Sequence, residues 1–437
     1  MRKFVEYEHG MIPDSWNVVK LGGELNGYNV LLDIRNGYTG QQSKPKATFK
    51  VSRIETIGGG FIDEDRVQYI DNVPPAILDK YLLKKGDILF SHINSDIHLG
   101  KTGIALKDYD DLLHGMNLLL FRANEEVIES DFLNFIFIFF RQKGIFISIC
   151  SRAVNQSSIN QAKLKNLDIP LPPKFERRNI SHILSTFKCA IEKQQQIIDI
   201  SLALKKSLLH QLFTQGTKGE KLKETELGVI PESWRMIKII ELGEIVTGTT
   251  PKTSVPEYYI PAEFDFIAPA DLGKSCKVYK AQKTISKKGL RVSRELPKNT
   301  VLCVCIGSTI GKVGLTTKEK SATNQQINSI ICDETKTYPL FVYYLLHFYN
   351  KLWAEAATPS PVPILSKGSF SKLEIPFTDD LKEQIEIAKT LYFLESKVEL
   401  LEKKKRVYES LFKTLLNELM TGQLPVHSID FSSKNNN

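Results

Sequence analysis

The chain has few cysteines and none in a metal-binding pattern. There is no Cys-x-x-Cys pair and no Cys/His cluster with zinc spacing among its six cysteines, Cys150, Cys189, Cys276, Cys303, Cys305 and Cys332. We therefore expect no metal site and no disulfide framework, and a reducing cytoplasm fits best. Cys303 and Cys305 lie two apart in an apolar run, which predicts small buried residues on one face of a strand.

Long hydrophobic runs are also missing. The most apolar stretch, 132–149, is interrupted by Arg141, Gln142 and Lys143. Its unbroken part falls short of the ~20 residues that a membrane helix needs, and it predicts a core helix followed by a strand. At the start, Met1-Arg2-Lys3 leads into acidic and polar residues, so we expect no signal peptide.

Common catalytic motifs are missing as well. The sequence has no Asn-Pro-Pro-Tyr or Asp-Pro-Pro-Tyr, no Gly-x-Ser-x-Gly and no carboxylate pair with nuclease spacing. Gly100-Lys101-Thr102 resembles the end of a phosphate-binding loop, but Ser95 stands where that loop requires glycine. Gly-Lys-x-Gly occurs at 100–103 and 311–314 and predicts a tight basic turn whose lysine could meet a phosphate. We expect no catalytic residue.

The composition is that of a multidomain globular protein. With 437 residues, 42% hydrophobic and 25% charged, the chain is too long for one core, and we expect two to four domains. The formal net charge of +8 permits a phosphate-binding face without proving one.

Three segments return in the same order in the second half of the chain. Residues 10–16 return as 228–234, 167–170 as 373–376 and 208–214 as 415–421, at offsets of 218, 206 and 207. Solenoid units are about 20–50 residues long, so this repeat is a duplicated domain. We expect a pseudo-two-fold or similar relation between the halves, which suits a two-part target such as DNA read at two half-sites.

Each half is predicted to be a mixed α/β domain followed by a long helix. Strand-like apolar segments lie at 87–93, 118–121, 300–306 and 327–331, and Gly216 and Gly422 are placed to end the helices. The predicted class is α+β, with an internal repeat. The predicted boundaries are domains at 1–172 and 217–376, helices at 173–216 and 377–424, and a disordered tail at 425–437.

Both helices carry an apolar seam with alternating spacings of four and three. In the second helix, Lys405 alone breaks a seam that includes Leu391, Leu394, Val398, Leu401, Tyr408, Phe412, Leu415 and Leu419. The corresponding first-helix positions, 207 earlier, include Leu184, Phe187, Ile191, Ile198, Leu208 and Leu212. This spacing favours an antiparallel coiled coil about 50 Å long, the alternative being that each helix only covers its own domain.

The ordered motifs resemble one known family. They include Ile12-Pro13-Asp14-Ser15-Trp16 with its copy at 230–234, Gly248-Thr249-Thr250-Pro251, the segments 285–290 and 307–312, Asn324-Gln325-Gln326, and the helix openings 169–173 and 383–388. In this order, over nearly the whole length, they resemble the DNA-specificity subunit of type I restriction–modification systems.

The first half departs from this family's pattern. Arg177 stands where glutamine is usual, and the Gly-x-Thr-Pro segment is missing. Ser91-His92-Ile93-Asn94-Ser95 replaces the usual Gly-Ser-Ile-Gly stretch. Such variation is expected where each family member reads a different sequence.

The resemblance implies a non-catalytic subunit for phage defence and DNA methylation. Each target-recognition domain would read half of a split target, and the paired helices would fix a gap of about one 34 Å DNA turn. The resemblance also implies two methyltransferase subunits on the helices, and leaves open whether restriction or translocase subunits join them. S-adenosylmethionine would bind the partner, in a prokaryotic cytoplasm.

Candidate DNA contacts follow from side-chain chemistry, because Arg and Lys suit phosphates and guanine while Asn and Gln suit adenine. In the first domain the candidates are Arg35, Tyr38, Lys44, Lys46, His92, Asn94, Lys101, Arg152 and Asn155. In the second domain they are Thr249, Lys252, Lys287, Lys288, Arg291, Ser308, Lys312, Asn324 and Gln325.

Two other functions are open at this point. One is a self-contained methyltransferase or nuclease with an unrecognised site, which turnover without partners would reveal. The other is a coiled-coil scaffold that ignores DNA, which would show no salt-sensitive affinity for random duplex.

Overall fold

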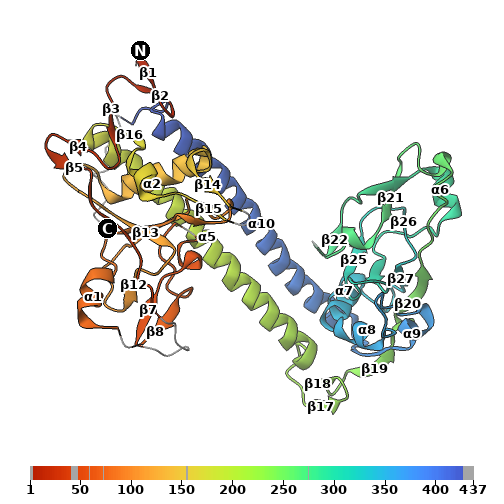
Figure 1. Cartoon of the computed structure of the whole chain (residues 1–437). Coiled ribbons are helices and arrows are strands. Elements are labelled where there is room, and N and C mark those ends of the chain that lie inside the picture. Colours follow the sequence, from red (N-terminus) through yellow and green to blue (C-terminus); the bar gives the residue numbers. More distant parts are fainter. Residues whose placement is uncertain are drawn as a thin grey trace. The chain divides into compact units, whose positions relative to one another are not determined.

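The computed structural model describes residues 3–40, 48–58, 60–71, 73–153, 156–273 and 275–426 (Figure 1). The chain forms two compact units. Unit 1 contains residues 1–194 and 404–437, and unit 2 contains residues 195–403. Each unit therefore combines one mixed domain with part of each long helix.

The long helices are α5 (Lys174–Gln215) and α10 (Leu381–Met420), with 42 and 40 residues. At 1.5 Å per residue they are about 63 and 60 Å long, more than the about 50 Å that the seams predict. Each begins within a few residues of the strand that closes its mixed domain. They end at Gly216 and Gly422, whose φ angles of 64° and 66° suit the left-handed conformation of a helix C-terminus.

The helices pack together in antiparallel fashion, as the heptad seams predict. In unit 1 the start of α5 lies in one core with the end of α10, including Leu184 and Leu419. In unit 2 the end of α5 lies in one core with the start of α10, including Leu212 and Leu391. All the seam residues named above are buried or half-buried. Ile197 and Leu204, two apolar residues of α5 that lie outside the seam, are exposed.

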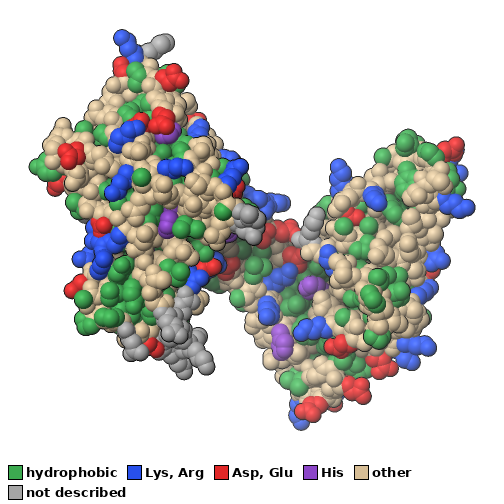
Figure 2. Space-filling model, viewed as in Figure 1, with side chains coloured by type: hydrophobic (Ala, Val, Ile, Leu, Met, Phe, Trp, Pro, Cys, Tyr) green, Lys and Arg blue, Asp and Glu red, His purple; other side chains and the backbone are tan. Residues whose placement is uncertain are grey.

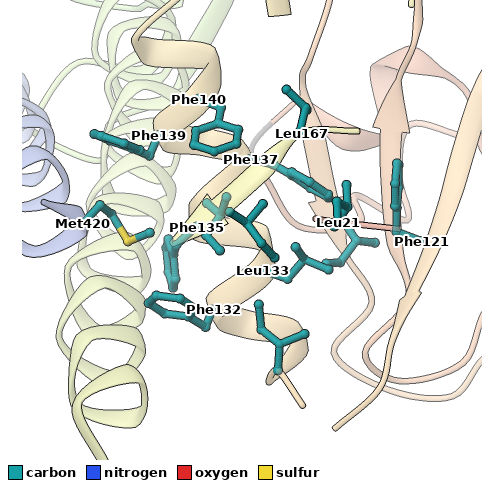
Figure 3. Close-up of a cluster of buried hydrophobic side chains, with 14 of the residues drawn as sticks. Leu21, Phe121, Phe132, Leu133, Phe135, Phe137, Phe139, Phe140, Leu167 and Met420 are labelled. Carbon is teal, nitrogen blue, oxygen red and sulfur yellow. The ribbon is translucent and has the colours of Figure 1, made fainter. Parts of the chain in front are cut away.

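The core of unit 1 is a four-stranded antiparallel sheet covered by a phenylalanine-rich helix. The sheet order is β11 (Thr102–Ile104), β9 (Ile88–Ser91), β13 (Leu118–Ala123) and β6 (Leu31–Asn36). Figure 3 shows side chains of α2 (Ser130–Gln142) directed both toward this sheet and toward the long helices. Among them Phe137 faces Phe121 of β13, with ring centroids 5.0 Å apart.

The strand predicted after this helix is wrong. The chain forms a second short helix, α3 (Ile145–Ile149), after Gly144 with φ of 76°. The apolar run is shared between two helices because a left-handed glycine redirects the chain without ending its helical tendency. Apolar runs this short cannot distinguish a strand from a buried helix by periodicity.

Unit 2 repeats the sheet of unit 1. Its order is β20 (Gly243–Thr247), β27 (Ile327–Cys332), β24 (Val301–Val304), β25 (Val313–Thr316) and β22 (Lys277–Val278). Here α7 (Pro339–Phe348) takes the place of α2. Buried Cys303 and Cys305 lie at this sheet as predicted, and burial raises the pKa of Cys305 to about 12.

A smaller sheet is also repeated. In unit 1 it consists of β12 (Leu112–Leu113), β7 (Phe49–Val51) and β8 (Gln68–Ile70), and in unit 2 of β23 (Lys283–Ile285), β21 (Phe264–Ile267) and β26 (Ser321–Thr323). Each has one parallel and one antiparallel pairing. The shared strand order of both sheets confirms the internal repeat.

The repeated opening segments fasten each domain to its helices. Hairpins β1 (Phe4–Tyr7) with β2 (Gly10–Pro13) and β17 (Leu222–Thr225) with β18 (Gly228–Pro231) lead into Trp16 and Trp234. The indole of Trp16 donates to Glu176 at 3.1 Å, and that of Trp234 donates to Glu383 at 3.3 Å. Strand β3 (Asn17–Lys20) then pairs with β16 (Asp168–Leu171), and β19 (Arg235–Lys238) with β28 (Glu374–Phe377), closing each domain.

The departure at Arg177 has a structural equivalent. Arg177 donates to Glu129, just before α2, at 2.8 Å, and to the carbonyl of Pro172. The corresponding Gln384 accepts from the backbone N–H of Tyr338, just before α7, at 2.8 Å. Different side chains therefore tie the long helix to the same place in each domain.

The remaining short helices are α1 (Pro75–Tyr81), α4 (Gln161–Lys165), α6 (Lys287–Val292), α8 (Lys351–Ala356) and α9 (Lys367–Lys372). The described helices include none with the length and apolarity for crossing a membrane. Of the predicted tail, Val426 is buried in the unit 1 core, and residues 427–437 lie outside the described residues.

Candidate nucleic-acid interface

In unit 2, three loops meet beside one end of the central sheet. We call the segments 248–252, 306–309 and 324–326 tip 2. The N–H of Thr249 donates to the carbonyl of Thr323 at 3.0 Å, and Gln326 Nε2 donates to the carbonyl of Ile306 at 3.4 Å. Tip 2 therefore brings together the predicted contacts Thr249, Lys252, Ser308, Asn324 and Gln325.

The amides of tip 2 have defined internal partners. Asn324 Nδ2 donates to Gln326 Oε1 at 2.8 Å, and Thr250 Oγ1 donates to Gln325 Oε1. Gln325 is exposed and Asn324 is half-exposed. These bonds orient the amides while leaving part of their hydrogen-bonding capacity for a base edge.

A basic helix lies in the same domain. The predicted contacts Lys287, Lys288 and Arg291 are all exposed on α6. Lys288 is paired with Glu257, whereas no ion pair is formed by Lys287 or Arg291 with any described residue. Arg294, just beyond α6, donates to the carbonyl of Thr247 and was missed by the sequence analysis because no motif contains it.

The equivalent loops of unit 1 form tip 1, defined as 37–40, 93–96 and 114–117. The N–H of Tyr38 donates to the carbonyl of His114 at 2.8 Å, the same bond that Thr249 makes in tip 2. A Cβ added to Gly37 would lie 1.8 Å from the carbonyl oxygen of Gly115, and one added to Gly248 would lie 2.1 Å from that of Asn324. Gly37 is therefore the counterpart of Gly248.

This correspondence shows what the sequence analysis missed. The first domain has no proline in this segment but keeps its glycine and threonine, as Gly37-Tyr38-Thr39-Gly40. Both glycines follow the edge strand of the central sheet, β6 or β20. Alignment on the strands, instead of on proline, would have revealed the segment.

Two other predicted contacts of unit 1 lie on the outer strands of a small three-stranded sheet. In the sheet β10 (Ile93–Asn94), β15 (Ser157–Ser158) and β14 (Ser151–Arg152), both Asn94 and Arg152 are paired in register with Ser157. The side chain of Arg152 is 68% exposed and 3.9 Å from Asp96. Asn94 and Arg152 thus lie on either side of Ser157, in the sheet that adjoins tip 1.

Two candidates of unit 1 are less accessible. Arg35 donates to the carbonyl of Lys80 at 2.6 Å and forms an ion pair with Asp33. Only 8% of His92 is exposed, and burial lowers its pKa to about 4, so the imidazole is neutral at neutral pH. Lys44, Lys46 and Asn155 lie outside the described residues.

The two lysines of the Gly-Lys-x-Gly turns lie at pockets next to the long helices. Lys101 lines a pocket with Lys188 of α5, and Lys312 lines one with Lys205 of α5 and Glu395 of α10. The turn glycines face protein: a Cβ on Gly100 would lie 2.4 Å from the ring of Phe146. Both lysines are half-exposed.

Charge is dispersed over the visible face of each unit. Figure 2 shows Lys and Arg side chains interspersed with Asp and Glu, with no single continuous basic surface. Within the described ranges there is no group of His, Cys, Asp and Glu side chains arranged to hold a metal ion. The arrangement suits local recognition by loop side chains supported by separate cations.

Comparisons with known proteins agree with this fold and repeat. The family model for the type I restriction modification DNA specificity domain matches residues 31–201 and again 231–409. The chain is 34% identical to the putative type I restriction enzyme MjaX specificity subunit of Methanocaldococcus jannaschii, over 97% of each chain. It is 25% identical to the MjaVIII specificity subunit of the same organism, over 97% of this chain and 96% of the relative.

A solved structure has the same fold. The type I restriction–modification S subunit from M. genitalium has a TM-score of 0.62 and 16% identity, covering 92% of this chain and 96% of that one. Two successive matches to one domain model, together covering most of the chain, also explain the repeated strand order. The chain belongs to the family of type I restriction–modification DNA specificity subunits.

Proposed function

We propose that each unit reads one half of a split DNA target, with tip 1 and tip 2 as the base-reading surfaces. Recognition domains at 1–172 and 217–376 would supply the tips. Cations on and near α6, together with Arg152 in unit 1, would hold the DNA backbone. The protein would act without catalysis of its own.

One observation carries this proposal: the two tips have the same backbone arrangement but different side chains. Tyr38 occupies the position of Thr249, and both make the same backbone hydrogen bond. Gly115 in tip 1 corresponds to Asn324 in tip 2. A reader of two unlike half-sites needs this combination, because base contacts specify sequence and the scaffold only positions them.

The long helices would set the gap between half-sites. A helix of 42 residues is about 63 Å long, which compares with about 34 Å for a DNA turn. Changing the helix length should therefore change the number of undefined base pairs between the two blocks.

The helices also offer apolar surface for partner subunits. In unit 2, Ile200 of α5 and Phe393 and Leu400 of α10 are 69%, 68% and 66% exposed. In unit 1, Val407 of α10 is 64% exposed. Such residues on a helix are typical of protein interfaces, and we assign them to two methyltransferase subunits, which restriction or translocase subunits would join.

The methyl donor would belong to the partner. We place S-adenosylmethionine in the methyltransferase subunits, because the sequence contains no Asn-Pro-Pro-Tyr or Asp-Pro-Pro-Tyr motif. The complex would act where the cell keeps its DNA, in a prokaryotic cytoplasm.

The decisive experiment is to co-express the chain with a cognate methyltransferase and to map methylated bases across a genome. The expected result is a split motif with two short defined blocks and a fixed gap. Asn324→Ala should relax one block and leave the other unchanged, with Glu402→Ala on the exposed face of α10 as the control. Methylation or cleavage by the purified chain alone would instead support an enzyme.

A further inference from the structure

A small pocket in unit 1 is lined by cations. It has a volume of about 180 Å³ and lies between the Gly-Lys-x-Gly turn, α2 and α5. Lys101, Arg141 and Lys188 are among its lining residues, which include no carboxylate. Gly58, Gly60 and Gly100 also line it, and a Cβ on Gly60 would collide with the Lys188 ammonium.

Two of these cations are held in place by carbonyl or ring partners. Arg141 donates from Nε to the carbonyl of Leu99 at 3.2 Å and from Nη2 to that of Ile97 at 2.8 Å. Lys101 Nζ lies 2.9 Å from His98 Nδ1. None of these partners neutralises the positive charge.

Lys188 is the most unusual of the three. Only 8% of it is exposed, and its ammonium has neither an ion pair nor a hydrogen bond with any described residue. Its Nζ lies 4.4 Å from the ring centroid of Phe61 and beside Gly60, where an added Cβ would collide with it. Glu192 and Asp131 act on it electrostatically, but neither comes within ion-pair distance.

Burial of an ammonium group without a counter-ion is costly. Desolvation lowers the pKa of Lys188 to about 8, so the group is still mostly protonated at neutral pH. Buried charges in native proteins are normally paired, and an isolated one indicates that a partner is missing.

At the equivalent position of unit 2, the buried charged group has hydrogen-bond partners within the protein. Glu395 is 207 residues after Lys188, and it accepts from Lys205 at 2.7 Å, from the N–H of Cys276 at 2.8 Å and from Tyr344 at 3.0 Å. Cys276 corresponds to Gly60, since their carbonyls accept from equivalent strands, β25 and β11. Phe412 stands in unit 1 where Lys205 stands in unit 2.

We propose that the unit 1 pocket binds a phosphate group, held by Lys188, Lys101 and Arg141. Three cations around one small pocket exceed what a single carboxylate needs, whereas a phosphate offers several oxygens and more than one negative charge. The phosphate is either one of the DNA backbone or a free phosphate ion, and the chemistry of the pocket is the same for both.

The first test uses inorganic phosphate and the full-length chain. Calorimetric titration in chloride buffer should show phosphate binding that acetate at equal ionic strength does not reproduce. Lys188→Met keeps the apolar length of the side chain and should weaken phosphate binding about tenfold or more. Lys193→Met, at an exposed position of the same helix, should bind as the wild type does.

The second test separates the two sources of phosphate. If a DNA phosphate fills the pocket, Lys188→Met should lower the salt slope for random duplex DNA by about 0.9, and free phosphate should compete with DNA. If the occupant is a free ion, the DNA slope stays unchanged while phosphate binding is lost.

Three results would overturn the proposal. They are equal binding of acetate and phosphate, equal phosphate affinity in Lys188→Met and the wild type, and no detectable phosphate binding in the calorimetric titration. If Lys188→Met does not fold, Lys101→Met tests the same pocket from a half-exposed position. Neither titration depends on the partner subunits, so failure here leaves the proposed function intact.

Discussion

Unit 1 and unit 2 have the same strand order but opposite charge at the junction between recognition domain and long helix. In unit 2 the buried carboxylate of Glu395 is surrounded by three donors from α5, α7 and the chain before β22. In unit 1 the buried ammonium of Lys188 faces an aromatic ring and a cationic pocket. The two copies of the repeat therefore share a backbone but differ at this position. In unit 2 the buried charge has hydrogen-bond partners within the protein, and in unit 1 it has no counter-ion among the described residues.

The contacts that both units keep are the ones that fix the helix to the domain. The indole–carboxylate hydrogen bond is present in both, as Trp16 with Glu176 and Trp234 with Glu383. The contacts that differ lie at the tips and at the junction pockets. We infer that the fastening of domain to helix is structural and that the divergent places carry the separate tasks of the two units.

The largest expected effect comes from removing the tryptophan that fixes each domain to its long helix. Trp16→Ala and Trp234→Ala should each lower the free energy of unfolding by about 3–5 kcal/mol, because each removes a large buried ring. Hydrogen exchange read separately in the two units should show the loss mainly in the mutated unit. A loss confined to one of the two variants would break the equivalence of the units.

Lys188→Met should act in the opposite direction. In phosphate-free buffer it should raise the free energy of unfolding by about 3 kcal/mol at neutral pH, since the folded pKa of about 8 lies below the ordinary lysine value of 10.5. Because the unfolded chain binds the proton more tightly, wild-type stability should rise with pH between about 8 and 10.5. The gain from the substitution should therefore shrink over that window.

Paired chemical denaturation of both proteins at several pH values measures this difference and cancels the titration of other groups. A gain that stays constant from pH 7 to about 10.5 would show that the Lys188 ammonium is not the source. Lys193→Met, exposed on the same helix, should show no comparable gain.

Glu395→Leu should destabilise unit 2, by about 2 kcal/mol. The substitution leaves the N–H of Cys276 and the hydroxyl of Tyr344 without their acceptor in a buried place. The side chain of Lys205 is 23% exposed and can turn toward solvent, which keeps the effect below that of a fully buried pair. Opposite signs for Glu395→Leu and Lys188→Met in thermal denaturation would confirm the contrast, and equal signs would refute it.

Much of the fold follows from the sequence because the repeat and the heptads are local patterns. Helix termination at Gly216 and Gly422 and the pairing of the helices required only spacing and glycine chemistry. The helix after Gly144 was mistaken for a strand because short apolar runs have no distinctive period. Tertiary packing decided that segment.

The candidate site was only partly predictable. Thr249, Asn324 and Gln325 come together because they belong to motifs at strand ends, whose approximate position is readable from the chain. His92 is buried and Lys188 has no counter-ion among the described residues, and neither fact has a sequence signal, since burial depends on how distant segments pack. The equivalence of Lys188 and Glu395 was visible in the offset of 207, but its meaning required the structure.

The smallest expected effect concerns the two repeated lysines. Lys312→Ala should weaken binding to random duplex and lower its salt slope by about 0.9 if Lys312 meets a DNA phosphate, and Lys101→Ala should do the same in unit 1. Filter binding at several salt concentrations measures both slopes, with Lys206→Ala on the exposed face of α5 as the control. Lys312 lines a pocket that also contains Glu395, so its charge is partly balanced, whereas the other charged residues that line the pocket of Lys101 are both cations. A lower salt slope for Lys101→Ala alone would therefore show that the two junctions also differ in DNA binding. An unchanged slope for both variants would remove both lysines from the DNA interface.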